Sequence, residues 1–457
     1  MPAKKIVCLG AGSRYFLGAL PDILVCEPLA ESEITLYDID QDKVRLLQAQ
    51  ATLWADAAGT GMQVRACDDL ADAVDGADFA VSSIGGSGVS GRGIASTSFH
   101  MHDIVIPAQY GIYQIVGDTA GPAGMMMALR SIPAYITICR EMERRCPEVI
   151  FLQHSNPMAA VCRAVSKYTS ITIVGICHGV QNGIRSLAQL LATEPEELEV
   201  VWIGTNHYHW FTSIRHQGRD VYDAVRRLLA ERGAPSGGIM TQKLSDIYGY
   251  QIVYPHDDHI IEFYPFLAQV RSEAEMPYGL SLRLGGFTLE EARRALSVQM
   301  SDEEHRSQRQ ADLGDYAHDL AGVTLPPAPT SPLRGEGLGQ LISSIAAGSR
   351  NVFIVNVPNQ GAVINLPAYA ILELEGVTDS TGVRPIVVGE APMPLMGLLQ
   401  KRIAWQEMVV DAAVKGDRGL ALQALLLDEM AIPPEKAEAM LDQLLQASRP
   451  MLPAFFA

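Results

Sequence analysis

The first eighteen residues constrain the fold of this chain more than any other stretch. Residues 6–9 (IVCL) form a short apolar run, as expected for a strand buried on both faces of a parallel sheet. Gly10, Gly12 and Ser13 follow at once, and residues 15–26 have the apolar spacing of a helix. A glycine turn between such a strand and a helix brings backbone N–H groups and the helix dipole to a pyrophosphate.

A carboxylate follows the next expected strand, residues 33–37. This residue, Asp38, is placed to accept hydrogen bonds from an adenosine ribose. Tyr15 stands where the third glycine of G-x-G-x-x-G would be, and a glycine pair by itself also fits an ordinary tight turn. Taken together, strand, turn, helix and Asp38 predict a site for NAD. The carboxylate disfavours NADP, because a 2′-phosphate would meet a negative charge.

Strand and helix patterns alternate as far as about residue 205. The expected strands are residues 4–9, 33–37, 62–66, 79–83, 149–153 and 172–176, and the clearest expected helices are residues 40–58, 96–110 and 125–145. Such alternation predicts an α/β fold, a Rossmann-type doubly wound parallel sheet. The fourth strand runs into a second glycine-rich turn that begins at Gly85. Ligands bind at the carboxyl ends of such strands, so Gly85 is expected to contact the cofactor, the alternative being a lid hinge.

The alternation breaks down in the second half of the chain. Here the patterns indicate strands at 202–205, 209–215 and 352–357, a helix at 220–232, a Pro/Gly-rich loop at 322–339 and C-terminal helices over 395–447. We therefore expect an NAD-binding Rossmann-like domain over residues 1–200. An α+β domain for catalysis and oligomerisation is expected over residues 201–457.

Composition excludes several classes of partner. The net charge of −17 over 457 residues argues against nucleic acid or an anionic membrane as the main partner. The seven cysteines are scattered without CxxC pairs, which suits a reducing compartment. A strand starts within a few residues of the N-terminus, and no apolar run is long enough to span a bilayer. The expectation is a cytoplasmic enzyme.

Polar residues at strand ends are the first candidates for chemistry. Asn156 precedes a proline after the expected strand 149–153, which presents its carboxamide at the ligand-binding edge, although Asn-Pro is also a common turn. Asp118 lies in the glycine-flanked GDTAG loop. It is expected to act as a general acid in a pocket that excludes water, or to cap the helix that starts near Ala123.

Cys177 and His207 lie just after neighbouring expected strands, in the segments CHG and NHYHWF. A thiolate and an imidazole from two elements can hold one divalent metal and leave positions open for substrate oxygens. The alternatives are a small buried cysteine and a hydrogen-bonded core histidine. Further along, the HDDH segment contains Asp257 and His259, which could supply a base or form a solvated polar loop.

The ordered set of motifs resembles the NAD- and divalent-metal-dependent glycosidases of glycoside hydrolase family 4. The matching segments are GAGS, GDTAG, SNP, CHG, NHYHWF, HDDHIIEFYPF and VNVPNQGAVINLP, spread over residues 4 to about 367 and weakest between about 270 and 330. Among its members the chain looks most like the α-glucosidase, α-galactosidase and α-galacturonidase branch. The resemblance implies a fold similar to that of lactate and malate dehydrogenases. It also implies a homodimer or homotetramer.

This resemblance implies redox chemistry instead of hydrolysis by two carboxylates. NAD takes a hydride from C3 of the sugar and later returns it, while Mn²⁺ or another divalent metal polarises the C3 ketone. A base removes the acidified C2 proton, the aglycone leaves with help from an acid, and water adds. Carried over residue by residue, Cys177 and His207 are the metal ligands and Asp118 is the acid. Asn156 contacts substrate and nicotinamide, and further substrate contacts are assigned to His178 and Asn206.

The base is the open position in this carry-over. The HDDH segment resembles the Gly-Asp-Arg-His pattern of the non-phosphorylated α-glycosidases, which makes Asp257 the candidate base, with His259 beside it. The chain has His256 for the glycine and Asp258 for the arginine, so the sugar specificity stays open. Members that act on 6-phosphoglycosides use a tyrosine instead, and tyrosines 250 and 254 remain alternatives.

The favoured function is cleavage of a non-phosphorylated α-glycoside by this mechanism. A 6-phospho-glycosidase, or a glycosidase for acidic sugars such as uronides or sulfoquinovosides, would use the same chemistry. A net NAD-dependent 2-hydroxy-acid dehydrogenase is the alternative from another class. It lacks support, because no Asp-x-x-Arg followed by a catalytic histidine of that type is present.

Overall fold

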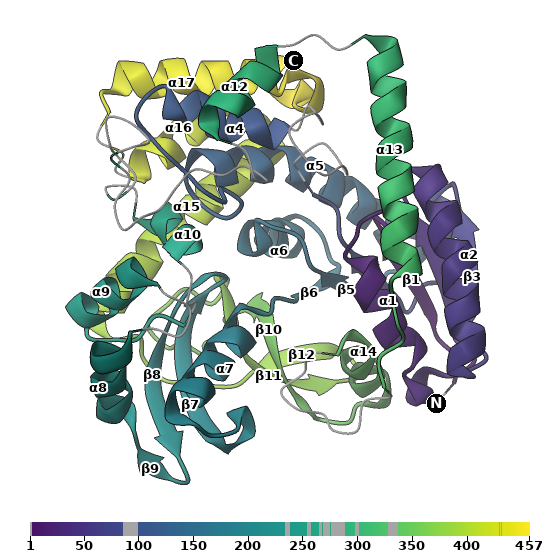
Figure 1. Ribbon diagram of the computed structural model, residues 1–457, viewed down its shortest axis with the longest axis horizontal. Coiled ribbons are helices and arrows are strands. Elements are labelled where there is room, and N and C mark those ends of the chain that lie inside the picture. Colours follow the sequence, from purple (N-terminus) through teal and green to yellow (C-terminus); the bar gives the residue numbers. More distant parts are fainter. Residues whose placement is uncertain are drawn as a thin grey trace.

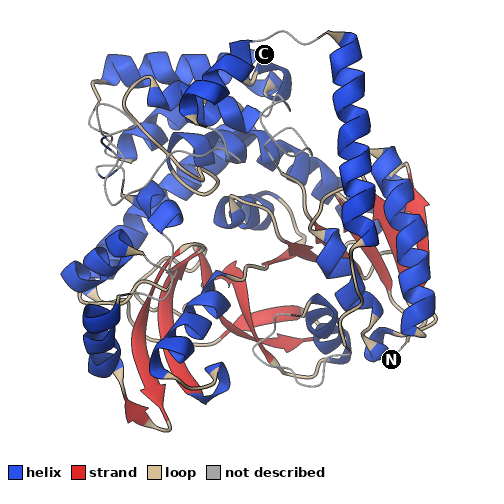
Figure 2. Cartoon of the chain, in the orientation of Figure 1, coloured by secondary structure: helices blue, strands red, loops and turns tan. Residues whose placement is uncertain are grey.

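The computed structural model describes residues 2–85, 99–233, 238–253, 257–264, 267, 275, 288–297, 301–327, 337–428, 430 and 432–457. A nine-stranded sheet runs through the molecule in the order β12-β11-β10-β6-β5-β4-β1-β2-β3 (Figures 1 and 2). Its strands are β1 (Lys5–Leu9), β2 (Glu33–Tyr37), β3 (Gln63–Cys67), β4 (Phe79–Ser82), β5 (Ile150–Gln153), β6 (Thr172–Gly175), β10 (Val352–Pro358), β11 (Ile371–Asp379) and β12 (Gly382–Pro385). Strands β1 to β6 are parallel and lie in the order 3-2-1-4-5-6, which confirms the expected Rossmann-type sheet.

Apolar side chains of each central strand point alternately to two separate cores. In β1, Ile6 and Cys8 belong to one core, and Val7 and Leu9 belong to the other. The first core is covered by α1 (Phe16–Leu24), α2 (Gln41–Ala58), α13 (Asp302–Ala321) and α14 (Leu338–Ala347). The second is covered by α3 (Leu70–Val74), α5 (Gly121–Arg145), α6 (Met158–Tyr168), α15 (Met393–Lys415), α16 (Arg418–Leu427) and α17 (Pro434–Ala447). Burial on both faces explains the continuous apolar runs in the sequence.

A second, antiparallel sheet is formed by β7 (Leu198–Thr205), β8 (Tyr208–His216) and β9 (Arg219–Asp220). Helices α7 (Gly179–Leu191) and α8 (Tyr222–Arg232) contribute to its core, and they lie beside it in Figure 1. The remaining α-helices among the described residues are α4 (Phe99–Ala108), α9 (Ile239–Tyr248), α10 (Asp257–Ile260) and α12 (Leu289–Ser297). In the described part of the chain, no helix has the length and apolar character needed to cross a bilayer.

The six strands expected before residue 200 are all present, with ends that differ by one residue at most. The second half departs further from expectation, because β11, β12 and α13 were not foreseen. Strand β10 pairs antiparallel with β6 at Asn356 and Gly175, so the second half of the chain extends the sheet of the first. The division at residue 200 stays a prediction. Of the expected loop 322–339, residues 328–336 lie outside the described residues, and α14 begins at Leu338.

Candidate active site

The glycine turn lies where the strand order reverses, between β1 and β4. Gly10 has a φ of +76°, and a Cβ on it would lie 2.4 Å from the carbonyl oxygen of Ser83. A Cβ on Gly12 would lie 3.0 Å from the Asp38 carboxylate. The Ser13 and Ser83 hydroxyls are 2.9 Å apart. A glycine turn that packs this closely against its neighbours, at the point where the strand order reverses, forms the kind of site that binds a dinucleotide.

Asp38 joins the end of β2 to this turn. One of its carboxylate oxygens accepts the backbone N–H of Gly12 at 2.8 Å, and the other accepts that of Asp40 at 2.8 Å. Gly85 is exposed just beyond β4, and residues 86–98 of the second glycine-rich segment lie outside the described residues. Gly10, Gly12, Ser13 and Asp38 therefore form one group. Their roles in binding NAD stay a prediction.

Helix α13 lies against this group from the second half of the chain, beside α2 in Figure 1. Arg14, which follows the turn, pairs with Asp319 at 2.7 Å. The fully buried Lys43 of α2 pairs with Asp312 at 2.6 Å, and the Tyr316 hydroxyl donates to the carbonyl of Ala11 in the turn at 3.4 Å. Sequence reasoning missed this helix. Its usable signal was the capping box SDEE that opens it, confirmed by the bond from the backbone N–H of residue 304 to the Ser301 hydroxyl.

Five of the candidate residues converge at the carboxyl end of the parallel strands. Asn156 follows β5, Cys177 follows β6, and Asp118 lies in the loop before α5. His207 comes from the turn between β7 and β8, and His259 comes from α10. The segments that supply them are far apart in the sequence and meet through folding.

Cys177 and His207 form the pair expected for a metal. The Cys177 Sγ lies 3.5 Å from the His207 Nε2. His207 is buried and has a φ of +61°, a left-handed conformation that is uncommon outside glycine and is concentrated at functional sites. Burial lowers the pKa of His207 to about 4, so the imidazole is neutral, as a metal ligand must be. Burial raises the pKa of the Cys177 thiol, so an entering cation would displace a proton. A soft thiol and a neutral imidazole at this spacing fit a divalent metal.

Asp118 lies on the other side of His207. Its carboxylate accepts the Thr119 hydroxyl at 2.6 Å and the Asn156 amide at 2.7 Å, and it lies 3.9 Å from the Nδ1 of His207 and of His259. Burial alone raises the pKa of Asp118, but the two histidines and the two hydrogen bonds outweigh it and hold the pKa below its ordinary value. Asp118 is therefore an ionised acceptor. It does not cap α5, whose N-cap residue is Ala120.

The same region offers a second set of possible metal ligands. One ligand atom from each of Asp118, His207 and His259 lies within 4.8 Å of the others. The rings of His207 and His259 meet edge to face, with centroids 4.6 Å apart. His207 therefore faces Cys177 with one nitrogen and the Asp118 side with the other.

Glu262 is a buried residue of the site that sequence reasoning missed. Its carboxylate accepts backbone N–H groups of the Asp118 loop, from Gly117 at 2.6 Å, Thr119 at 3.2 Å and Ala120 at 3.3 Å. Burial and the nearby charge of Asp118 raise its pKa well above the ordinary value for a glutamate. A single carboxylate inside the apolar run IIEFYPF was the signal, because buried charges are kept only where they have partners.

Asp257 takes a different position from that of the other candidates. Its buried carboxylate accepts the backbone N–H groups of Met240 and Thr241 at 3.0 and 2.7 Å, and the Thr241 hydroxyl at 2.7 Å. It thus caps the first turn of α9. His259, two residues on, points to Asp118 instead. Tyr254 and His256 lie outside the described residues, so the identity of the base stays a prediction.

The two further substrate contacts also differ in their surroundings. Asn206 is buried and donates to the Glu373 carboxylate at 3.0 Å. His178 is exposed at the N-terminus of α7, with its ring centroid 5.6 Å from that of His154. His178 is therefore open to a ligand, whereas Asn206 is already tied to the protein. Both roles stay predictions.

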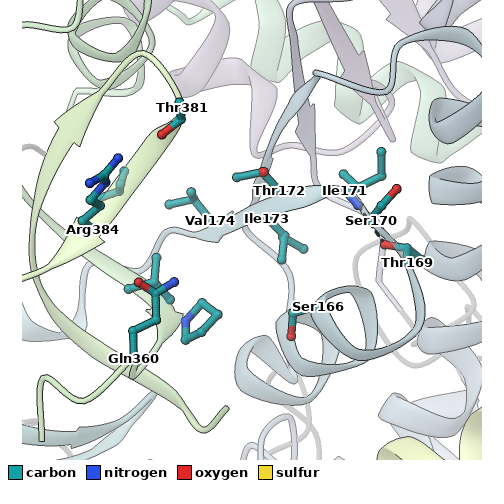
Figure 3. Close-up of a pocket in the computed structure, with 13 residues that line it drawn as sticks. Ser166, Thr169, Ser170, Ile171, Thr172, Ile173, Val174, Gln360, Thr381 and Arg384 are labelled. Carbon is teal, nitrogen blue, oxygen red and sulfur yellow. Dashed lines mark hydrogen bonds between the residues drawn. The ribbon is translucent and has the colours of Figure 1, made fainter. Parts of the chain in front are cut away.

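A separate cavity of about 330 Å³ lies elsewhere on the sheet, where β6 and β10 diverge (Figure 3). The residues that line it are Ser166, Thr169, Ser170, Ile171, Thr172, Ile173, Val174, Val357, Pro358, Gln360, Thr381, Val383 and Arg384. None of them is a predicted site residue. The candidate active site is therefore defined by the cluster around Asp118 and His207, not by this cavity.

Comparisons with known proteins identify the family of the chain. A model of the family 4 glycosyl hydrolases matches residues 5–193, and a model of that family's C-terminal domain matches residues 202–431. An alpha-galactosidase of Bacillus subtilis is 28% identical over 428 residues, with 93% of each chain covered. An alpha-galacturonidase of Lachnoclostridium phytofermentans is 28% identical, with 98% of this chain and 97% of that one covered.

Solved structures show the same fold. A 6-phospho-alpha-glucosidase from gut microorganisms, in complex with NAD and Mn²⁺, superposes with a TM-score of 0.76 at 22% identity, covering 98% of this chain and 99% of that one. The malate dehydrogenase of Cryptosporidium parvum superposes with a TM-score of 0.50 at 11% identity, covering 90% of this chain and 99% of that one.

Proposed function

Because the chain belongs to family 4 of the glycosyl hydrolases, and is therefore a glycosidase, we propose that it cleaves non-phosphorylated α-glycosides with the help of NAD and a divalent metal. The proposed substrate class is supported by the relatives named alpha-galactosidase and alpha-galacturonidase, neither of which is named for a phosphorylated sugar. The competing proposal is a 6-phospho-glycoside, the substrate class in the names of several similar structures.

The observation that carries the proposal is the pair formed by Cys177 and His207. Their Sγ and Nε2 atoms lie 3.5 Å apart, and the Asp118 carboxylate stands behind the other imidazole nitrogen. An ordinary glycosidase needs two carboxyl groups on either side of the scissile bond, not a thiol. A thiol and an imidazole, together with a dinucleotide site, instead fit the oxidation of a carbon that carries a hydroxyl group.

Four residues would hold NAD: Gly10 and Gly12 by close backbone approach to the pyrophosphate, Ser13 at the start of the helix, and Asp38 at the ribose. Cys177 and His207 would hold the metal. When bound, the two groups supply hydride exchange at C3 of the sugar and polarisation of the oxygen on that carbon.

The remaining residues act on protons and orientation. Asp118 is ionised and faces the cluster, so it can take up a proton and later deliver it to the glycosidic oxygen. Asn156 holds one oxygen of Asp118 and lies after β5, where its carboxamide can orient a sugar hydroxyl. The proton at C2 requires a second group. We retain Asp257 as the proposed base, with Tyr250 and Tyr254 as the alternatives.

A panel of aryl α- and β-glycosides, neutral, acidic and 6-phosphorylated, assayed with NAD and Mn²⁺, tests the substrate class. We expect turnover of neutral or acidic α-glycosides without accumulation of NADH. The sugar released in D₂O should carry deuterium at C2, provided that the base exchanges its proton with solvent. Stoichiometric NADH formation would identify a dehydrogenase. Hydrolysis that leaves C2 unlabelled and shows no isotope effect at C2 or C3 would contradict the proposed mechanism.

A further inference from the structure

We propose that Thr119 is a positioning residue that fixes the tautomer of His207 and so aims the Nε2 lone pair at the metal position. The inference rests on the proposed metal role of Cys177 and His207. It concerns a hydroxyl that lies between Asp118 and His207. Its evidence is the position of this hydroxyl, which donates to Asp118 and lies within hydrogen-bond distance of the His207 Nδ1.

A hydroxyl group has one proton to donate and two lone pairs to accept with. The Thr119 Oγ1 lies 2.6 Å from the Asp118 Oδ1 and 3.0 Å from the His207 Nδ1. The Thr119 hydroxyl donates its one proton to the Asp118 carboxylate oxygen. Toward His207 the same oxygen has only a lone pair to offer. The Nδ1 of His207 must therefore carry the proton, which leaves Nε2 unprotonated and facing the Cys177 Sγ at 3.5 Å.

Neighbouring contacts keep this chain of bonds in one direction. The Asn156 amide donates to the second oxygen of Asp118 at 2.7 Å, which leaves the first oxygen for Thr119. The backbone N–H of Thr119 donates to Glu262 at 3.2 Å, so the loop that carries the hydroxyl is itself tied down. Thr119 is buried, with 5% of its surface exposed, so water does not compete for its proton.

The consequence for the metal follows from the imidazole. A ligating histidine commonly donates its other ring N–H to an oxygen, which sets its tautomer and orientation, and loss of that partner costs about 10- to 100-fold in metal affinity. Without the Thr119 hydroxyl, the proton of His207 can move to Nε2, where it would point at the metal position. Thr119 therefore adds to metal affinity through His207.

Co²⁺ binding to the full-length protein tests the inference, with the thiolate-to-cobalt absorption band as the readout. Thr119→Val removes the hydroxyl and keeps the shape, and we expect its Co²⁺ dissociation constant to rise about 10- to 100-fold. Thr119→Ser keeps the hydroxyl and should stay near the wild-type value. Thr35→Val makes the same change at a buried threonine of β2 away from the cluster and should leave Co²⁺ binding unchanged.

The controls separate this inference from the proposed metal site. If the wild-type protein shows no such band, or if Cys177→Ser keeps it, the proposed metal site is wrong. If wild type and Cys177→Ser behave as expected but Thr119→Val binds Co²⁺ as tightly as wild type, the metal site stands and the role of Thr119 is overturned. Imidazole ¹⁵N shifts of the metal-free wild type, assigned with His207→Gln, decide the matter without a threonine variant. A proton on Nδ1 supports the inference, and a proton on Nε2 overturns it.

Discussion

The two halves of the candidate active site are built in different ways. The core of the NAD half joins neighbouring segments, since the bond from Gly12 to Asp38 spans 26 residues, and α13 adds outer contacts from 305 residues away. The catalytic half joins distant ones, since the contact between Thr119 and His207 spans 88 residues and the bond from Gly117 to Glu262 spans 145. The first half depends on strand-turn-helix geometry. The second requires two sheets and two loops to be in place at once.

This difference predicts which property a substitution in each half should affect. A change in the catalytic half should mainly affect chemistry or metal binding, because its charged groups face one another in a buried cluster. A change in the NAD half should mainly affect stability or cofactor affinity, because its groups hold the backbone turn. Each variant below tests one side of that comparison.

The largest effect is expected for the metal pair. Cys177→Ser and His207→Ala should each lower kcat by about a thousandfold or more, since a Lewis acid contributes several kcal/mol to the transition state. Removal of metal with EDTA should do the same and be reversed by Mn²⁺ only in the wild type. Cys67→Ser in β3 is the matched control and should keep full activity. Full activity of the metal-free Cys177→Ser protein would contradict any role of a metal in the mechanism.

Asp118 and Asp257 should separate chemistry from structure. Asp118→Asn is expected to lower kcat by about 10²- to 10⁴-fold, as for loss of a group that moves a proton. Asp257→Asn should lower the free energy of unfolding by about 1 kcal/mol, because the carboxylate caps α9. If it also lowers kcat while metal affinity is kept, the proposed base is supported. A stability loss with kcat unchanged would show that Asp257 is not the base and would leave Tyr250, Tyr254 or His259 as candidates.

The ion pair under α13 should matter for stability. Asp312→Asn leaves the buried Lys43 ammonium without its carboxylate, and we expect a loss on the order of 3 kcal/mol in the free energy of unfolding. The exposed pair of Arg418 and Asp442 provides the control, since Asp442→Asn should cost less than about 1 kcal/mol. Denaturant titration measures both. Equal losses would mean that the buried pair between α2 and α13 contributes no more to stability than an exposed pair.

Glu262 should make stability depend on pH. Its pKa is raised in the folded protein, so the folded state binds more protons than the unfolded state above about pH 4.3. The contribution of Glu262 to stability is therefore fully present below that pH and declines as the pH rises toward the folded pKa. Glu262→Gln should cost about 1–2 kcal/mol near pH 4, because one of the two oxygens that face the loop N–H groups is replaced by an amide nitrogen, which cannot accept. The deficit should shrink toward pH 7. A deficit that grows with pH would contradict the raised pKa.

The smallest effect is expected at Asp38. Wild-type protein should bind NAD at least about tenfold more tightly than NADP, a difference of about 1.4 kcal/mol. Asp38→Asn keeps an acceptor for the Gly12 N–H but removes the charge, so the preference for NAD over NADP should become smaller. Fluorescence titration with both reduced cofactors measures it. If the wild-type protein bound NAD and NADP equally, the proposed contact between Asp38 and the ribose would be wrong.

The sequence by itself determined the parallel sheet and the glycine turn with Asp38, and it singled out Cys177 and His207 as a candidate metal pair. Each of these features shows in a short stretch of sequence. Burial on both faces gives an apolar run, a close approach of the backbone requires glycine, and a metal site requires particular residue types. The family resemblance added the expected chemistry, but no local pattern identified Thr119 as a partner of His207.

Only the tertiary structure decided the contacts that cross long stretches of chain. Glu262, Thr119 and α13 became visible through bonds that span 88 to 305 residues, and Asp257 turned out to cap α9. A carboxylate such as Asp257 lies close in sequence to a helix start, a strand end or an apolar run. From the sequence alone, it could therefore accept hydrogen bonds from several different groups. Which one it binds is settled by the burial and hydrogen-bond direction that the packed fold imposes.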